Sequence, residues 1–110
     1  MHLTLIRHGE TYWNELGKVQ GQIDIELLPS GIDQAAKLGQ KMKSEINQYS
    51  VIYCSQLKRA VVTAENIRLD SPIKLIPDSR LNSRNLGNFS GLTLEQINEK
   101  YPTLYHARLS

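Results

Sequence analysis

LTLIRHGET, residues 3–11, is the stretch that decides the fold of this chain. Its apolar start is typical of a short strand covered on both faces, and we predict a strand over residues 2–6. The run ends abruptly at Arg7, His8 and Gly9. Open α/β sheets bind their ligands outside the carboxyl ends of strands. The sequence therefore predicts a site there, with His8 as a candidate nucleophile and Arg7 beside it to hold an anion.

Length and composition indicate one small globular domain. The chain has 110 residues, of which 40% are hydrophobic and 22% charged, as in ordinary globular proteins. A net charge of +2 from scattered basic residues argues against nucleic-acid binding. No apolar run is long enough to span a membrane, and the N-terminus lacks a signal-peptide layout. The single Cys54 excludes an intramolecular disulfide and suits a reducing compartment, so we expect a cytoplasmic protein.

Strand and helix patterns alternate along the chain. After the first strand and a long polar connection, we expect a helix over residues 31–46 with Ser30 as its N-cap, a strand over 51–54, a helix capped by Ser55, a strand over 73–76 and a short helix opened by a capping box of Thr93 and Gln96. Such alternation predicts an α/β fold whose parallel strands are joined by right-handed crossovers.

Four side chains of this pattern suit a phosphate ester. Arg59 is expected in the first turns of a helix whose start shares the sheet edge with His8. Arg7, Arg59, the amide of Asn14 and free N–H groups at that helix N-terminus would attract the phosphate. A neutral imidazole attacks phosphorus to give a phosphohistidine. We expect no metal and no cofactor, because the sequence has neither a metal-ligand cluster nor a Gly-rich phosphate loop.

These residues belong to a longer set of motifs. The set comprises Leu5–Thr11, Trp13-Asn14, Gln20-Gly21, Gly31, Gln34-Ala35, Leu38, the run Ile52-Tyr53-Cys54-Ser55-x-Leu57-x-Arg59-Ala60-x-x-Thr63-Ala64, Leu81, Arg84–Gly87 and Gly91. In order and spacing it resembles the histidine phosphatase superfamily, also called phosphoglycerate mutase-like. The resemblance implies a three-layer α/β sandwich with a mostly parallel sheet, of which residues 1–110 form the first half of the domain.

The resemblance also implies roles for single residues. By it, His8 is the phosphorylated nucleophile, Arg7 and Arg59 bind the phosphoryl group, and Asn14 adds a further phosphate contact. We expect Gln20 and Gly21 at the mouth of the substrate site. The Gly-rich run from Gly87 to Gly91 is more similar to the bacterial phosphatases of the family than to its glycolytic mutases.

Two departures from the family pattern concern proton transfer. The family segment Leu-x-Glu-Arg-x-x-Gly carries the proton donor at its Glu, and Ser83 stands at that position here. A hydroxyl is a poor general acid, and losing this role costs about 10²–10⁴-fold in rate. The family's second catalytic histidine lies in a His-Gly segment that His106, followed by Ala107, does not match. We expect the C-terminal part of the domain to be absent.

Three functions are compatible with this pattern. The first is hydrolysis of a small phosphorylated metabolite through a phosphohistidine, and the second is phosphate binding by a non-catalytic remnant. The third, phosphoglycerate mutation, is disfavoured by the short connection after Gly91. An incomplete sheet also has uncovered edges, so we expect self-association through such an edge, and neither nucleic-acid nor membrane partners.

Overall fold

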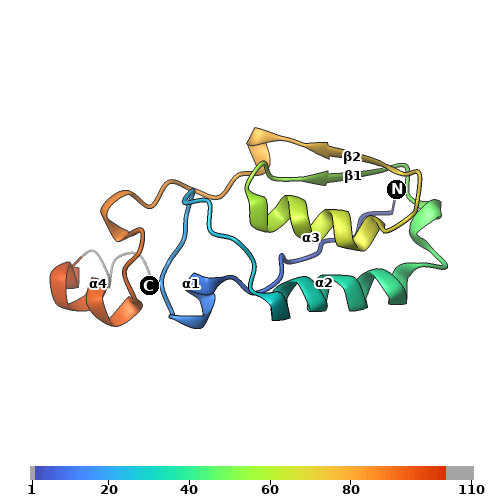
Figure 1. Ribbon diagram of the computed structural model, residues 1–110. Coiled ribbons are helices and arrows are strands. Elements are labelled where there is room, and N and C mark those ends of the chain that lie inside the picture. Colours follow the sequence, from blue (N-terminus) through green and yellow to red (C-terminus); the bar gives the residue numbers. More distant parts are fainter. Residues whose placement is uncertain (1, 104–110) are drawn as a thin grey trace.

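A computed structural model describes residues 2–103 of the chain (Figure 1). In chain order its elements are α1 (Tyr12–Glu15), α2 (Pro29–Met42), β1 (Val51–Cys54), α3 (Lys58–Arg68), β2 (Lys74–Pro77) and α4 (Leu94–Lys100), with single 3-10 turns at Ile46–Gln48, Ser79–Leu81 and Gly87–Phe89. Helices and strands therefore alternate between α2 and β2, as the sequence predicted.

The two strands form a parallel sheet. Val51 pairs with Lys74, and Cys54 at the other end of β1 pairs with Pro77. Helix α3 connects the strands and packs against them, and α2 packs against α3 (Figure 1). The predicted α/β class with a parallel sheet is thus confirmed.

The apolar core lies between the two long helices and the sheet. Its buried cluster consists of Met42, Ile46, Ile67 and Ile73, and the partly buried Leu38, Tyr49 and Ile52 pack against it. Ile52 points toward this core, so the next residue of the strand, Tyr53, points to the opposite face. Tyr53 is 57% exposed, which shows that this face of the sheet is open.

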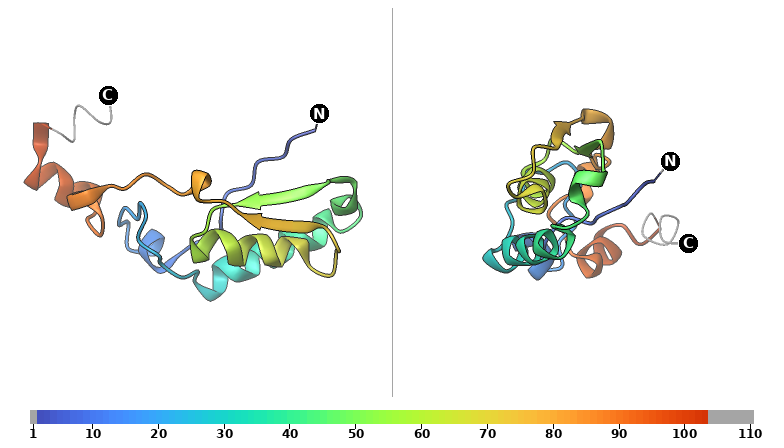
Figure 2. Two further views of the ribbon diagram at one scale, coloured as in Figure 1. Left: turned by 90° about the horizontal axis from the view of Figure 1, so that it is seen from above. Right: turned by 90° about the vertical axis from the view of Figure 1, so that its right-hand side faces the viewer.

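The strand predicted over residues 2–6 is wrong for this structure. The segment runs extended but outside the sheet (Figure 2), and Leu3 and Leu5 are 75% and 86% exposed. Within residues 2–103, its backbone makes no hydrogen bond to β1 or β2. Its anchor is instead a 2.5 Å hydrogen bond between the hydroxyls of Thr4 and Tyr49. A short apolar run forms a strand only where a neighbouring backbone completes the hydrogen-bond ladder.

Two helix starts differ from the prediction. Helix α2 begins at Pro29, with Leu28 in the N-cap position, because proline with its fixed φ and missing N–H suits the first helical residue. Helix α3 begins at Lys58 after Leu57, so Ser55 is not its cap. The capping box of Thr93 and Gln96 at α4 is confirmed.

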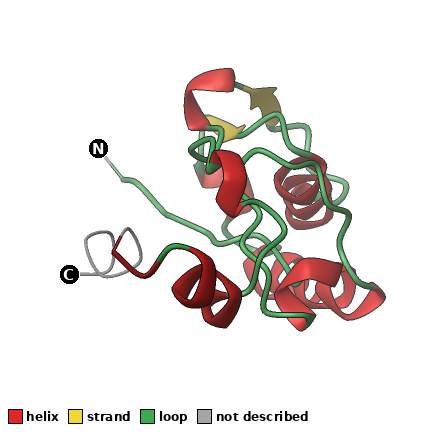
Figure 3. Cartoon of the chain, turned by 90° about the vertical axis from the view of Figure 1, so that its left-hand side faces the viewer, coloured by secondary structure: helices red, strands yellow, loops and turns green. Residues whose placement is uncertain are grey.

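The described part of the molecule is elongated. It extends 48 × 29 × 21 Å and its radius of gyration is 16.0 Å, whereas a compact domain of this length has about 13 Å. Helix α4 lies at the end opposite the sheet (Figure 1), and much of the chain is loop, drawn green in Figure 3. No helix in residues 2–103 is long and apolar enough to cross a membrane. His106 lies outside the described residues.

Candidate active site

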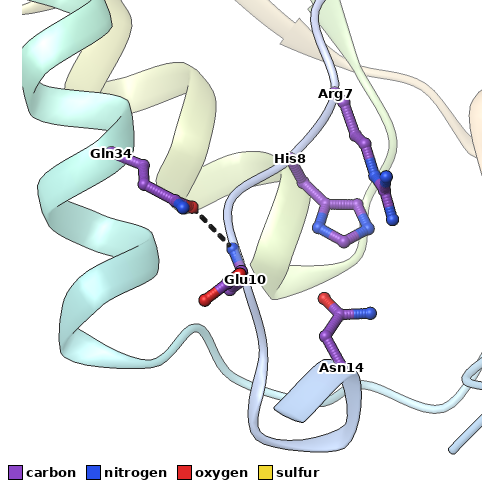
Figure 4. Close-up of a pocket in the computed structure, with 5 residues that line it drawn as sticks. All are labelled: Arg7, His8, Glu10, Asn14 and Gln34. Atoms are coloured by element: carbon purple, nitrogen blue, oxygen red, sulfur yellow. Dashed lines mark hydrogen bonds between the residues drawn. The ribbon is translucent and has the colours of Figure 1, made fainter. Parts of the chain in front are cut away.

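An open polar pocket lies where the N-terminal segment meets the first turns of α1 and α2. Arg7, His8, Glu10, Asn14 and Gln34 line it. Figure 4 shows the Arg7, His8 and Asn14 side chains around one space, with Glu10 directed away from the imidazole. The structure therefore brings together three of the residues that the sequence singled out.

His8 is held in a form suited to nucleophilic attack. Its half-buried ring has Nδ1 2.6 Å from the carbonyl oxygen of Gly9. A carbonyl only accepts, so Nδ1 carries the proton of this bond and Nε2 of the neutral ring keeps its lone pair. Burial lowers the pKa of His8, the bond to Gly9 opposes this, and the positive charges of Arg59 and Arg7 lower the pKa further.

The loop that carries His8 packs backbone against backbone on α2. A Cβ at Gly9 would lie 2.8 Å from the carbonyl carbon of Gly31, a distance that real side chains do not reach, so both glycines are required for this approach. The amide of Glu10 donates to Oε1 of Gln34 at 3.1 Å (Figure 4). The amide of Gly9 donates to Oγ1 of Thr63 in α3 at 3.1 Å. Both long helices therefore hold the His8 loop.

Asn14 is oriented by the start of α1. Its Oδ1 accepts from the amide of Thr11 at 3.0 Å, and its own amide donates to Oγ1 of Thr11 at 3.1 Å. This capping box uses the side-chain oxygen of Asn14 and leaves its NH₂ group to face the pocket. Thr11 is fully buried and its hydroxyl donates to Oε1 of Gln20 at 2.6 Å.

Arg59 lies beside the pocket but does not line it in this structure. It is 3% exposed, and its guanidinium donates to the carbonyl oxygens of Ile23 at 2.7 Å and Gly21 at 2.5 Å. A weaker contact of 3.4 Å joins it to Oγ of Ser83. Its positive charge still acts on the pKa of His8. Its predicted role as a phosphate ligand stays a prediction.

Gln20 and Gly21 do not line the pocket but hydrogen-bond residues next to it. Gln20 accepts from Thr11, and the carbonyl of Gly21 accepts from Arg59. Gly21 has a φ of +55° and packs against the backbone of Arg84, which explains the need for glycine. The prediction that they lie at the mouth of the substrate site stays a prediction.

The N-terminus of α3 already has an anionic partner. Oδ1 of Asp24 accepts from the amide of Lys58 at 2.7 Å, so a carboxylate sits where free N–H groups were expected to attract phosphate. Sequence reasoning missed Asp24, Gln34 and Thr63 as site-building residues. For Thr63 and Gln34 the signal was their place in the quoted motifs, whereas Asp24 had none.

Two further observations bear on the chemistry. Among residues 2–103, no group of three or more His, Cys, Asp or Glu side chains is placed to hold a metal ion. Cys54 is buried, and burial raises the pKa of its thiol, which makes it a poor nucleophile.

Comparisons with known proteins agree on one family. The model of the "Histidine phosphatase superfamily (branch 1)" matches residues 3–110. The chain is 35% identical to phosphoglycerate mutase-like protein 4 of Arabidopsis thaliana, in an alignment that covers 96% of this chain and 46% of that protein. It is 38% identical to phosphoserine phosphatase 1 of Hydrogenobacter thermophilus, in an alignment that covers 91% of this chain and 46% of that protein.

A solved structure agrees in fold. The structure of Bacillus stearothermophilus YhfR superposes with a TM-score of 0.84 at 34% identity, over 93% of this chain and 50% of that one. The chain spans about half the length of the relatives it matches.

Proposed function

The chain belongs to the histidine phosphatase superfamily, branch 1, and on that premise we propose that His8 accepts the phosphoryl group of a small phosphomonoester. The observation that carries the proposal is the bond between Nδ1 of His8 and the carbonyl of Gly9. This bond directs the proton to one ring nitrogen and leaves the other free to attack, in a pocket that Arg7 and Asn14 share.

The first chemical step follows from this arrangement. Nε2 of His8 attacks phosphorus in line, the N–P bond forms, and the bond from phosphorus to the ester oxygen breaks. The guanidinium of Arg7 and the NH₂ of Asn14 stabilise the phosphoryl oxygens, and Arg59 adds positive charge behind them. Water then attacks phosphorus, the N–P bond breaks and phosphate leaves with His8 restored.

The leaving alcohol needs a proton in the first step. Ser83 stands at the position where the family resemblance implies a Glu, and its hydroxyl lies 3.4 Å from the guanidinium of Arg59. A serine hydroxyl is far less acidic than the carboxylic acid it replaces, so it is a poor general acid for the leaving oxygen. This observation favours the second candidate function, which is phosphate binding without turnover.

The partner we propose is a small phosphorylated metabolite. Relatives of the chain carry the names phosphoserine phosphatase and phosphoglycerate mutase-like protein, and the pocket is polar and open. Hydrolysis is preferred over mutation because the connection after Gly91 is short. A cytoplasmic location is part of the proposal, on the ground of the single, buried Cys54.

Phosphorylation trapping tests the function directly. The chain is incubated with ³²P-labelled acetyl phosphate and quenched in base, because phosphohistidine is stable in base and labile in acid. We expect label on His8 and none in His8→Asn, while His2→Asn, a change at an exposed histidine, keeps it. Label that survives acid, or that persists in His8→Asn, would refute the nucleophile.

Binding of inorganic phosphate separates the two candidates. Phosphate that binds the chain and is lost in Arg7→Ala, with no label on His8, supports phosphate binding without turnover. Label and binding together support the hydrolase. A chain that neither binds phosphate nor takes up label contradicts both.

A further inference from the structure

One buried hydroxyl connects the His8 loop to the helix of Arg59. Thr63 is 5% exposed. Its Oγ1 accepts from the amide of Gly9 at 3.1 Å and donates to the carbonyl of Arg59 at 2.6 Å. A helical threonine often bonds the carbonyl four residues earlier with no further consequence. The additional bond from Gly9, 54 residues away in sequence, joins two parts of the site.

The peptide groups on both sides of Gly9 determine how the imidazole lies. The amide before it is fixed by Thr63, and the carbonyl after it accepts from Nδ1 of His8. Gly9 is buried against the backbone of Gly31, which limits where the loop can lie. Within that space the hydrogen bonds set how the peptide is turned, and the bond to Thr63 is the one that reaches α3.

The same hydroxyl also sets the spacing between His8 and Arg59. It bonds the carbonyl of Arg59 itself, so the turn of α3 that presents the guanidinium is tied directly to the backbone of His8. Without the hydroxyl, the Gly9 amide would be buried with no partner, a state that native structures avoid. The loop would then move to find one, and His8 would move with it.

We propose that Thr63 is a positioning residue of the site: its hydroxyl fixes the His8–Gly9 peptide against α3 and so sets the direction of the imidazole. This inference rests on the proposed function, in which Nε2 of His8 meets the phosphoryl group. Thr63 itself touches no substrate, since it does not line the pocket.

Three variants isolate the hydroxyl. Thr63→Val keeps the shape of the side chain and removes the two bonds, whereas Thr63→Ser keeps the hydroxyl. Thr93→Val is the matched control, because it also removes a hydroxyl that accepts a backbone N–H, at α4 on the other end of the molecule (Figure 1). The readouts are hydrogen exchange of the Gly9 amide and the affinity for inorganic phosphate, both followed by NMR.

In Thr63→Val we expect exchange of the Gly9 amide to rise roughly tenfold and phosphate affinity to fall roughly tenfold, the effect of one lost buried hydrogen bond. Thr63→Ser should stay within about twofold of the original chain in both, as a hydroxyl in the same place makes the same bonds. Thr93→Val should change neither. If the original chain binds phosphate, equal affinity in Thr63→Val and Thr63→Ser overturns the proposal. Unchanged Gly9 exchange in Thr63→Val overturns it in every case.

The exchange readout keeps this test separate from that of the proposed function. A chain that binds no phosphate fails the proposed function, yet a faster Gly9 exchange confined to Thr63→Val still supports the positioning bond. If Thr63→Val does not fold, hydrogen exchange in the unsubstituted chain tests the proposal. The Gly9 amide must then exchange as slowly as the buried amide of Ile67 in α3, and fast exchange overturns the proposal.

Discussion

Replacing Gly31 by alanine tests how the His8 loop sits on α2. Gly31 lies in the first turn of the helix, where alanine is ordinarily the better residue by up to about 1 kcal/mol. Here, however, a Cβ would overlap the carbonyl oxygen of Glu10 and lie 2.8 Å from its amide nitrogen. Both of these atoms are backbone, so the clash cannot be relieved by turning a side chain.

The expected loss follows from the contacts that must move. Overpacking of this kind costs about 1–3 kcal/mol. The shifted Glu10 also weakens its carbonyl bond from the amide of Leu28, 2.9 Å long, and its amide bond to Gln34, of which one lost bond costs about 0.5–1.5 kcal/mol. After subtracting the helix gain of about 1 kcal/mol, the free energy of unfolding should fall by roughly 0.5–3.5 kcal/mol.

Urea unfolding followed by circular dichroism measures this loss. Gln40→Ala, at an exposed position of the same helix, is the control for helix propensity and should leave stability within about 0.5 kcal/mol. Gly31→Ala should also weaken phosphate binding, because the same loop carries His8. An alanine variant that is more stable than the original chain would refute the close approach of the two backbones.

Three further outcomes are expected. Diethyl pyrocarbonate modifies the neutral imidazole, so modification of His8 should rise with pH, with a midpoint below 6.5 because the pKa of His8 is lowered from that value. The unfolded chain then binds the proton more readily, so the free energy of unfolding should fall as the pH is lowered through 6.5. A midpoint above 6.5 contradicts this. Thr93→Ala should remove the cap of α4 and cost about 1 kcal/mol, visible as faster exchange of the Gln96 amide, whereas unchanged exchange there argues against the capping box. Sedimentation should show association at high concentration that Leu5→Lys weakens, because Leu5 is 86% exposed, and a monomer at every concentration would speak against the predicted self-association.

The sequence predicted the long helices well, because their signals are local. The apolar positions of α2 and α3 repeat at helical spacing, and Thr93 with Gln96 forms the expected capping box. The parallel pairing of β1 with β2 followed from the helix between them. The strand over residues 2–6 failed for the opposite reason, since a strand is completed only by a neighbour that the local pattern does not reveal.

The sequence singled out residues that share one pocket but not the contacts that support them. Arg7, His8 and Asn14 line that pocket, and their phosphate chemistry stays a prediction. Arg59 lies beside the pocket, and the carbonyls of Gly21 and Ile23 that hold its guanidinium could not be foreseen. Such bonds join segments that are 36 and 38 residues apart in sequence, and backbone acceptors leave no trace in residue identity.

Because Ser83 stands in place of a general acid, the basicity of the leaving group should determine how fast the chain turns over an ester. An aryl phosphate expels a weakly basic phenolate that needs little protonation, whereas an alkyl phosphate expels an alkoxide that needs a general acid. The pocket contacts at His8, Arg7 and Asn14 do not involve Ser83, so both esters should bind alike. The chain should therefore act on p-nitrophenyl phosphate in preference to an alkyl ester such as phosphoserine. Ser83→Glu should narrow that preference by about 10²-fold or more, the usual contribution of a positioned acid, and an unchanged ratio would mean that residue 83 does not meet the leaving oxygen.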